Sequence, residues 1–221
     1  TIPFGSQDYV ISYEIIEAGV TVEYPFGGET LVPGETESIR WNAAGDDANT
    51  FTIDYTTDNG SNWILINNSV GANTRIYNWV VPSTFTSNAL IRVSRNNSSL
   101  TDNSDFNFSV LGQPAVTATN VCEGAVQLNW AAITGATSYN IVQLVNDSMQ
   151  IVGNTTSNSF VLTGLNKNKT YWMGVAAKNG LVQGRRSVSL QVQPNSGPCT
   201  LAIFNNDIKV DTILEPSTAR Q

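Results

Sequence analysis

Residues 163–180 read Thr-Gly-Leu-Asn-Lys-Asn-Lys-Thr-Tyr-Trp-Met-Gly-Val-Ala-Ala-Lys-Asn-Gly. The first half is rich in residues that favour turns, and the second half alternates as a β-strand does. Successive side chains of a strand point to opposite faces of a sheet, so Tyr171, Met173, Val175 and Ala177 share one face. Leu165 stands six residues before Tyr171, within the turn. The stretch therefore predicts a turn that leads into a core strand.

The composition indicates an all-β protein. The chain of 221 residues fits two β-sandwiches of about 100 residues each, with roughly twenty residues left over. A hydrophobic fraction of 41% is enough to fill two cores, and only 13% of the residues are charged. No long stretch has apolar residues at helical spacing. We therefore predict two tandem, seven-stranded, antiparallel β-sandwiches.

Charge and residue usage exclude several classes of function. A net charge of -7 argues against a nucleic-acid partner, and the one basic doublet, Arg185-Arg186, is interpreted as a solvated strand end. No apolar run approaches the ~18–20 residues that span a bilayer. The chain has no histidine and two cysteines, which excludes histidine-based nucleophile systems and an all-cysteine zinc site. We predict no catalytic residue, no cofactor and no metal site.

The alternation pattern divides the chain into four segments. We assign residues 1–16 to the end of a preceding domain or to an added edge strand, and residues 17–112 to a first sandwich. Residues 113–198 form a second sandwich, and residues 199–221 a linker and the start of a further domain. The strands predicted for the first sandwich begin near Val20, Ser38, Phe51, Trp63, Ile76, Ala89 and Phe106. Those of the second begin near Val116, Val126, Ala136, Ile151, Ser159, Tyr171 and Ser187.

The second predicted sandwich, residues 113–198, resembles a fibronectin type III domain. The resemblance rests on Leu165 and Tyr171, which match the corner where a buried tyrosine hydroxyl bonds a backbone group upstream, and on Trp130 at the core tryptophan position. The first predicted sandwich, residues 17–112, resembles an immunoglobulin-like module of large secreted bacterial proteins. This resemblance rests on Gly27-Gly28-Glu29, Ile39-Arg40-Trp41 and an Asp-Asn-Gly-x-x-Trp hairpin. In those relatives such a pair often lies downstream of a subtilisin-like or zinc protease domain.

The resemblance implies a non-catalytic role. We expect an accessory or spacer region of a secreted or cell-surface multidomain bacterial protein, which positions or stabilises a neighbouring domain such as a protease. The expected partners are neighbouring domains of the same chain, with a cell-surface protein or glycan as a further option, and the chain is expected to be monomeric. The alternative is an adhesion module that binds a glycan or a protein.

The two cysteines flank the second sandwich. A bond between Cys122 and Cys199 would close a long loop and stabilise the domain by about 4–5 kcal/mol on the chain-entropy model. In an otherwise cysteine-free chain with a secreted type of architecture, the disulfide is favoured over two buried free thiols.

The remaining candidates are predicted to be structural. Asp58 and Gly60 lie in a hairpin turn that resembles the Asp-box, in which aspartate and turn backbone bond each other and a tryptophan packs beneath. Trp41, Trp63, Trp79 and Trp130 fall at core positions. Trp172 lies opposite the Tyr171 face and is the one tryptophan that we place on the surface, as a candidate ligand contact.

An enzyme would need convergent carboxylates, and a binding module would need exposed aromatic side chains. Asp46, Asp47, Asp54 and Asp58 cluster in sequence, but they are interpreted as solvated acids, with Asp54 on the solvent face of its strand. Besides Trp172, the aromatic side chains to examine for exposure are Tyr77 and Tyr139.

Overall fold

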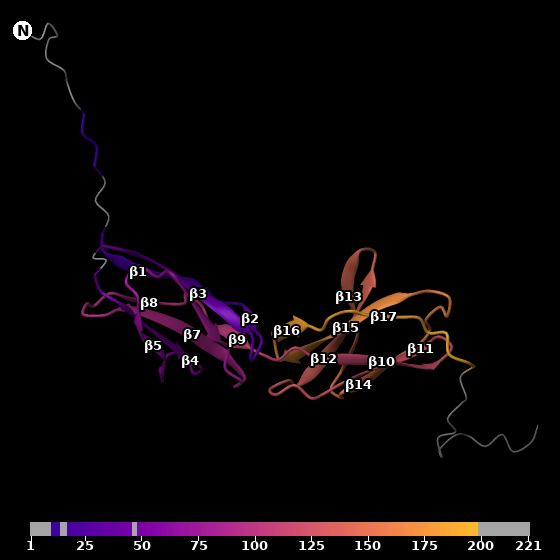
Figure 1. Ribbon diagram of the computed structural model, residues 1–221. Coiled ribbons are helices and arrows are strands. Elements are labelled where there is room, and N and C mark those ends of the chain that lie inside the picture. The colour runs from indigo at the N-terminus through magenta and orange to yellow at the C-terminus, as the bar shows by residue number, and fades with distance from the viewer. Residues whose placement is uncertain (1–9, 14–16, 46–47, 199–221) are drawn as a thin grey trace, which may run out of the picture.

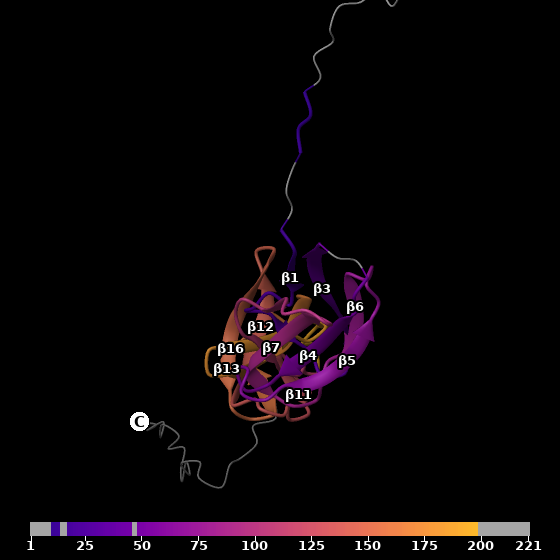
Figure 2. The same cartoon turned by 90° about the vertical axis from the view of Figure 1, so that its left-hand side faces the viewer.

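The computed structural model describes residues 10–13, 17–45 and 48–198. Every regular element within them is a β-strand, and the strands form two sandwiches arranged end to end (Figure 1). Viewed along the long axis, the two sandwiches overlap (Figure 2). The all-β fold class with two sandwiches is therefore confirmed. No helix in the described part of the chain could cross a membrane.

The first sandwich packs a three-stranded sheet against a six-stranded one. Its strands are β1 (Gly19–Tyr24), β2 (Thr30–Leu31), β3 (Thr36–Ala44), β4 (Phe51–Thr56), β5 (Ile64–Val70), β6 (Ile76–Val80), β7 (Thr86–Arg95), β8 (Thr101–Asn103) and β9 (Phe108–Val110). The small sheet has the order β1-β3-β6, and the large one β2-β9-β7-β4-β5, with β8 also paired to β7. All neighbours are antiparallel except β2 and β9, which are parallel.

Nine strands replace the seven that the sequence predicts for this domain. The two additional strands, β2 and β8, are two and three residues long. Neither is long enough to show an apolar alternation, so the pattern on which the prediction depends is missing from them.

The second sandwich has eight strands. They are β10 (Val116–Cys122), β11 (Ala125–Trp130), β12 (Ser138–Val145), β13 (Ser148–Thr155), β14 (Ser159–Leu162), β15 (Tyr171–Asn179), β16 (Val182–Arg186) and β17 (Leu190–Val192). One sheet has the order β10-β11-β14, and the other β13-β12-β15-β16, with β17 also paired to β15.

The last two strands are one edge strand with an interruption. Both pair with β15, and Ser187 lies between them. The Ser187 backbone N–H donates to the Val175 carbonyl at 2.8 Å, while the Val175 N–H donates to the Ser187 hydroxyl at 3.0 Å. A side chain thus replaces a backbone acceptor, and the ladder breaks without leaving the Val175 donor unpaired.

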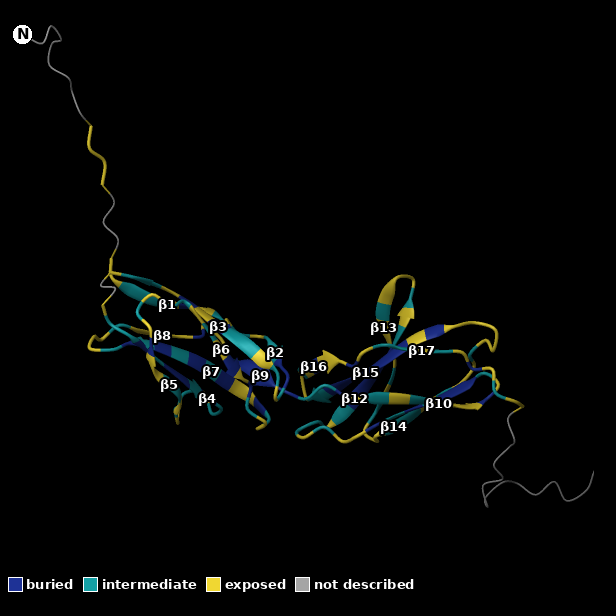
Figure 3. Cartoon of the chain, viewed as in Figure 1, coloured by how far each residue is buried: buried dark blue, intermediate teal, exposed yellow. Residues whose placement is uncertain are grey.

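Each sandwich has a core, and the strands that supply it carry dark blue, buried stretches in Figure 3. The first core includes Trp41, Phe51, Trp79 and Phe108, with the rings of Trp41 and Phe51 edge to face at 5.6 Å. The second contains the predicted face of residues 171, 173, 175 and 177 together with Trp130 and Tyr139. The alternation of β15 therefore marks the core side of its sheet.

The first segment contributes little to either sandwich where it is described. Residues 10–13 lie in no strand, and all four are exposed. The rest of the predicted run from Tyr9 to Ile16, like residues 199–221, lies outside the described residues.

Candidate functional site: the interdomain junction

The most distinctive site is the junction between the two sandwiches. Phe85, in the loop between β6 and β7 of the first sandwich, packs against the core of the second. Leu111, directly after β9, is fully buried and belongs to the same core. Two apolar side chains from outside the strands of the second sandwich therefore help to close its core.

Glycines allow this close approach. A Cβ added at Gly135 would overlap the Phe85 ring, and one at Gly112 would lie 2.9 Å from the Ile133 side chain. The Gly135 backbone also has a φ of +83°, a conformation that residues other than glycine rarely adopt. The two backbones can therefore meet at a distance that larger residues would prevent.

The loop that receives Phe85 is held by the second core. The Ile133 N–H donates to the hydroxyl of Tyr139 at 3.0 Å, and the ring of Tyr139 meets Trp130 edge to face at 5.1 Å. On the other side of the loop, the Asn179 side-chain amide donates to the Gly135 carbonyl at 2.5 Å. The surface that Phe85 contacts is therefore held to the second sandwich by partly buried hydrogen bonds on both sides of the loop.

Polar contacts cross the junction as well. The Arg185 guanidinium of β16 lies 2.5 Å from a Glu35 carboxylate oxygen and 3.7 Å from one of Glu37. Beside this ion pair, but within the second sandwich, the Gln113 side chain donates to the Arg186 carbonyl at 2.5 Å. Arg185 lies near the end of β16 and stays 44% exposed, as predicted, and it also forms an interdomain ion pair with Glu35 of the loop before β3 and with Glu37 of β3.

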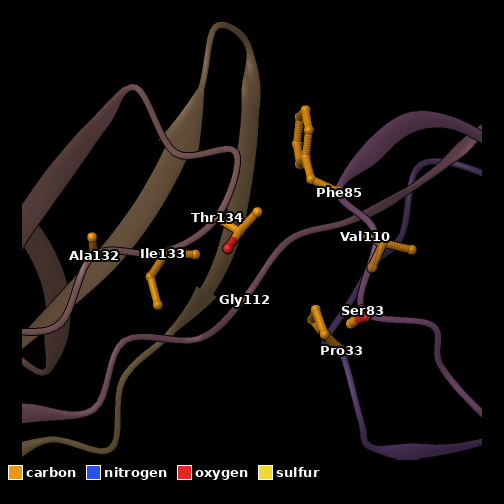
Figure 4. A pocket seen from close by; sticks show the side chains of 8 residues that line it. All are labelled: Pro33, Ser83, Phe85, Val110, Gly112, Ala132, Ile133 and Thr134. Carbon is orange, nitrogen blue, oxygen red and sulfur yellow. The ribbon is translucent and has the colours of Figure 1, made fainter.

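Between these contacts lies a shallow cleft of about 270 Å³ with walls from both domains (Figure 4). It is lined by Pro33, Ser83, Phe85, Val110, Gly112, Ala132, Ile133 and Thr134. The lining is mostly apolar, and it contains no titratable side chain. The cleft is therefore part of the junction, and its polar side chains are the hydroxyls of Ser83 and Thr134.

The predicted corner is present at the far end of the second sandwich. The Asn166 N–H donates to the Tyr171 hydroxyl at 2.8 Å, and Leu165 packs against the core. Cys122 lies at the same end, is buried and is not a free thiol. Cys199 lies outside the described residues, so its pairing with Cys122 stays a prediction.

The turn that contains Asp58 and Gly60 is stabilised from within. The Asp58 carboxylate accepts from the Thr56 hydroxyl at 2.6 Å and from the Asn62 backbone and side-chain N–H groups at 2.8 and 2.7 Å. These bonds, led by that of Thr56, lower the pKa of Asp58 from 3.8 to about 2. The Trp63 ring lies under Gly60, 3.5 Å from the position of a Cβ there.

Three of the predicted core tryptophans, Trp41, Trp79 and Trp130, are buried. Trp63 is not: it is partly exposed, and the Arg92 guanidinium lies 4.1 Å from its ring centroid. Trp63 precedes β5, so the alternation does not fix its direction. Trp172 is 43% exposed, on the surface as predicted.

One other expectation was wrong, and the two tyrosines to examine are both at least partly buried. Asp54 is buried rather than solvated, because Arg92 reaches across from β7 and pairs with it at 3.0 Å. Tyr139 is buried in the second core, with its hydroxyl used by Ile133, and Tyr77 packs partly against the first core. Asp46 and Asp47 lie outside the described residues. Among the described residues, no three acidic or cysteine side chains are grouped so that they could hold a metal ion.

The sequence did not single out Phe85, Leu111 or Gly135. Phe85 is an isolated aromatic residue in a loop, and Leu111 stands beside the glycine of the interdomain connection. A large apolar residue within a short connection is the one signal that could have indicated burial there.

Comparison with known proteins identifies the second sandwich. The family model described as Fibronectin type III domain matches residues 112–193. The second sandwich is therefore a fibronectin type III domain, and the chain combines it with a further β-sandwich of the same general architecture. No curated protein is similar to the chain in sequence.

Several solved structures are similar to the chain. A segment of two fibronectin type III domains from chicken tenascin is 13% identical, with 80% of this chain and 98% of that chain covered and a TM-score of 0.45. The FN1-FN3 domains of chicken CNTN1 are 16% identical, with 79% and 64% covered and a TM-score of 0.34. The sixth fibronectin type III domain of human fibronectin type III domain containing protein 3 is 23% identical, with 41% and 89% covered and a TM-score of 0.34.

Proposed function

We propose that the two sandwiches form a non-catalytic spacer that holds a neighbouring domain at a fixed distance and orientation. The observation that carries the proposal is the shared core at the junction, where Phe85 and Leu111 enter the second sandwich. Two domains joined by a free linker would move independently, which is the default for domains with a small interface. Here, apolar side chains would have to leave a core before the domains could rotate.

The contacts around the shared core also restrict the angle between the two sandwiches. Gly135 and Gly112 bring backbones together on one side, and the Arg185–Glu35 ion pair ties β16 to the first sandwich. An exposed ion pair contributes only about 0–1 kcal/mol, so its role is to select one angle rather than to hold the domains together. The apolar contacts supply the binding energy.

The path of the chain suits a spacer. In Figure 1 the first sandwich is entered at the end away from the junction, and the second is left at its far end. The hydrogen bond from the Glu123 N–H to the Gly197 carbonyl, 3.0 Å long, keeps the leaving segment at that far end. Neighbouring domains on the two sides would thus be separated by the length of two sandwiches.

The acids that an enzyme would need are used otherwise. Asp54 is paired with Arg92, and Asp58 stabilises its own turn. We therefore propose a supporting role in a secreted or cell-surface multidomain bacterial protein, next to a catalytic domain such as a protease. The partners in this proposal are neighbouring domains of the same chain, and the spacer acts as a monomer.

Residual dipolar couplings of the 221-residue chain would test the spacer. If the junction is stiff, the amides of both sandwiches fit one alignment tensor. The matched variant carries six Gly-Ser residues between Gly112 and Gln113, and it should require two tensors of different magnitude. Two tensors in the unmodified chain would contradict the proposal.

One observation favours the alternative, a binding module. Trp172 exposes 43% of its surface on the outer face of the larger sheet of the second sandwich, opposite the face that Tyr171 and Met173 bury in the core. A spacer and a binding surface are compatible, since the junction and β15's outer face involve different residues.

A further inference from the structure

Trp172 belongs to an apolar surface that extends across three strands. Leu144 of β12 pairs with Met149 of β13, and Gln143 pairs with Met173, which places Leu144 opposite Trp172 on the outer face. Ile151 follows Met149 on the same side of β13. Leu144, Ile151 and Trp172 are 41%, 60% and 43% exposed. We call these four residues, Leu144, Met149, Ile151 and Trp172, the Trp172 face.

A cation lies beside this face. Arg186 pairs with Ala176, two positions beyond Gly174 along β15, and its side chain bends back over Gly174, where a Cβ would meet its Cγ at 3.3 Å. The guanidinium donates to the Ser189 hydroxyl, next to Leu190, which pairs with Met173. The aliphatic part of Arg186 therefore extends the apolar surface toward Trp172, with its charge exposed at the border.

The charges of the two sandwiches are opposite. Residues 17–112 contain four basic and 11 acidic side chains, a net charge of -7, whereas residues 113–198 contain five basic and two acidic ones, a net charge of +3. The strands β12, β13, β15, β16 and β17 contain no Asp or Glu at all, but include Lys178, Arg185 and Arg186. Lys178 lies on the same side of β15 as Trp172, because the two are six residues apart.

We propose that the Trp172 face binds an acidic polypeptide segment, with an apolar side chain of that segment on Trp172 and its carboxylates near Arg186 and Lys178. An exposed apolar surface with a polar border is typical of an interaction site. The complementary charge indicates an acidic partner, since the strands of this sheet contain cations and no carboxylate. The nearest acid in sequence, Asp147, lies in the turn between β12 and β13, on the opposite side of the face from Arg186. Leu144 lies next to Trp172, and Met149 and Ile151 continue the apolar surface on the following strand, which favours an apolar side chain. Gln191 of β17, which pairs with Trp172, borders the face on its other side. The proposal does not depend on the spacer role.

Two-dimensional NMR of the ¹⁵N-labelled chain would test this surface. The probe is a capped peptide of twelve residues in which Glu and Leu alternate. It should shift the Trp172 indole signal and the amides of Leu144 and Ile151, and the shifts should weaken in 0.5 M NaCl. A peptide with Lys in place of Glu, or with Ser in place of Leu, should leave these signals unchanged.

Variants connect the binding to the proposed residues. Trp172→Ser and Arg186→Glu should each raise the apparent Kd about tenfold or more. The first removes the apolar contact with the peptide, and the second replaces an attractive charge by a repulsive one. The matched control is Val161→Ser, which alters a side chain 45% exposed on the other sheet and should leave the Kd unchanged. Amide signals far from the substituted residue, unchanged from the unmodified chain, show that each variant is folded.

Two outcomes would overturn the inference. Either the acidic peptide shifts no signal of the Trp172 face, or the shifts survive Trp172→Ser and Arg186→Glu. Polygalacturonate is titrated in parallel, and binding of this polyanion at Trp172 without binding of the peptide would replace the polypeptide partner by an acidic glycan. None of these results would alter the dipolar couplings across the junction, so the spacer proposal is tested separately.

Discussion

Phe85 of the first sandwich lies directly against Gly135 of the second, so closely that a Cβ on Gly135 would overlap its ring. The contact joins residues 50 positions apart. It requires the large ring of Phe85 and the absence of a side chain at position 135. A glycine at this position is thus as much a part of the interface as the phenylalanine.

Gly135→Ala is expected to separate the two sandwiches. The new methyl group must displace Phe85, and the backbone φ of +83° adds strain, so the second sandwich should lose about 1–3 kcal/mol. The measurement is urea unfolding of the whole chain, with domain alignment by residual dipolar couplings. The matched control is Gly164→Ala, which has a φ of +74° but open space around its Cβ position. It should cost the strain alone and keep a single alignment tensor. An equal effect of both substitutions would contradict the overlap.

Leu111→Ala should destabilise the second sandwich although the residue lies outside its strands. Leu111 is fully buried in that core, and truncation of a buried leucine costs about 2–5 kcal/mol. Leu181→Ala, at an entirely exposed leucine of the same domain, should change the free energy of unfolding by less than about 0.5 kcal/mol. Urea unfolding of each variant gives the comparison. For the same reason, a fragment of residues 113–198 should be less stable than one of residues 111–198, and equal stability would contradict the shared core.

The core of each sandwich could be predicted from local alternation, but the junction could not. Tyr171 is predicted correctly because its neighbours at every second position fix which face is buried, and because its hydroxyl needs only the turn just upstream. Asp54 obeys the same alternation and lies on the outer face of its strand, yet Arg92 covers it there. Arg92 is 38 positions away, and no local sequence pattern connects the two residues. Phe85 likewise depends on a glycine in another domain.

The interdomain ion pair is expected to affect motion more than stability. Arg185→Ala and Glu35→Ala should each change the free energy of unfolding by about 0–1 kcal/mol, because both side chains are about 40% exposed. Each should increase the spread of interdomain angles, which paramagnetic relaxation enhancement between the domains can measure. The double variant should add little to either single one. Additive changes in the angular spread would show that the two residues act independently. Lys167→Ala, which removes the cation of a different ion pair, should leave the angles unchanged.

Oxidation should be visible in the intact mass. The non-reduced chain is expected to be lighter than the reduced chain by two hydrogens, since Cys122 is not a free thiol and Cys199 is the one other cysteine. Cys199→Ser should abolish the mass difference and lower the thermal midpoint, because the loop closed by the bond is long. Identical masses before and after reduction would exclude the pairing.

Asp58 should give the first sandwich a pH dependence at unusually low pH. Its pKa is about 2 in the folded chain, against an ordinary value of 3.8, because Thr56 and Asn62 donate to the charged carboxylate. A depressed pKa stabilises the folded state above the ordinary value, and this contribution is lost as the pH falls from about 4 through 2. The carboxyl ¹³C shift of Asp58, followed from pH 6 to pH 1.5, should therefore show a midpoint near 2. Thr56→Val removes the leading donor and should move the midpoint back toward 3.8. Thr101→Val, whose hydroxyl bonds Ser94 near the opposite end of β7, should leave it in place. A midpoint near 3.8 in the unmodified chain would mean that the turn does not hold Asp58 as the hydrogen bonds indicate.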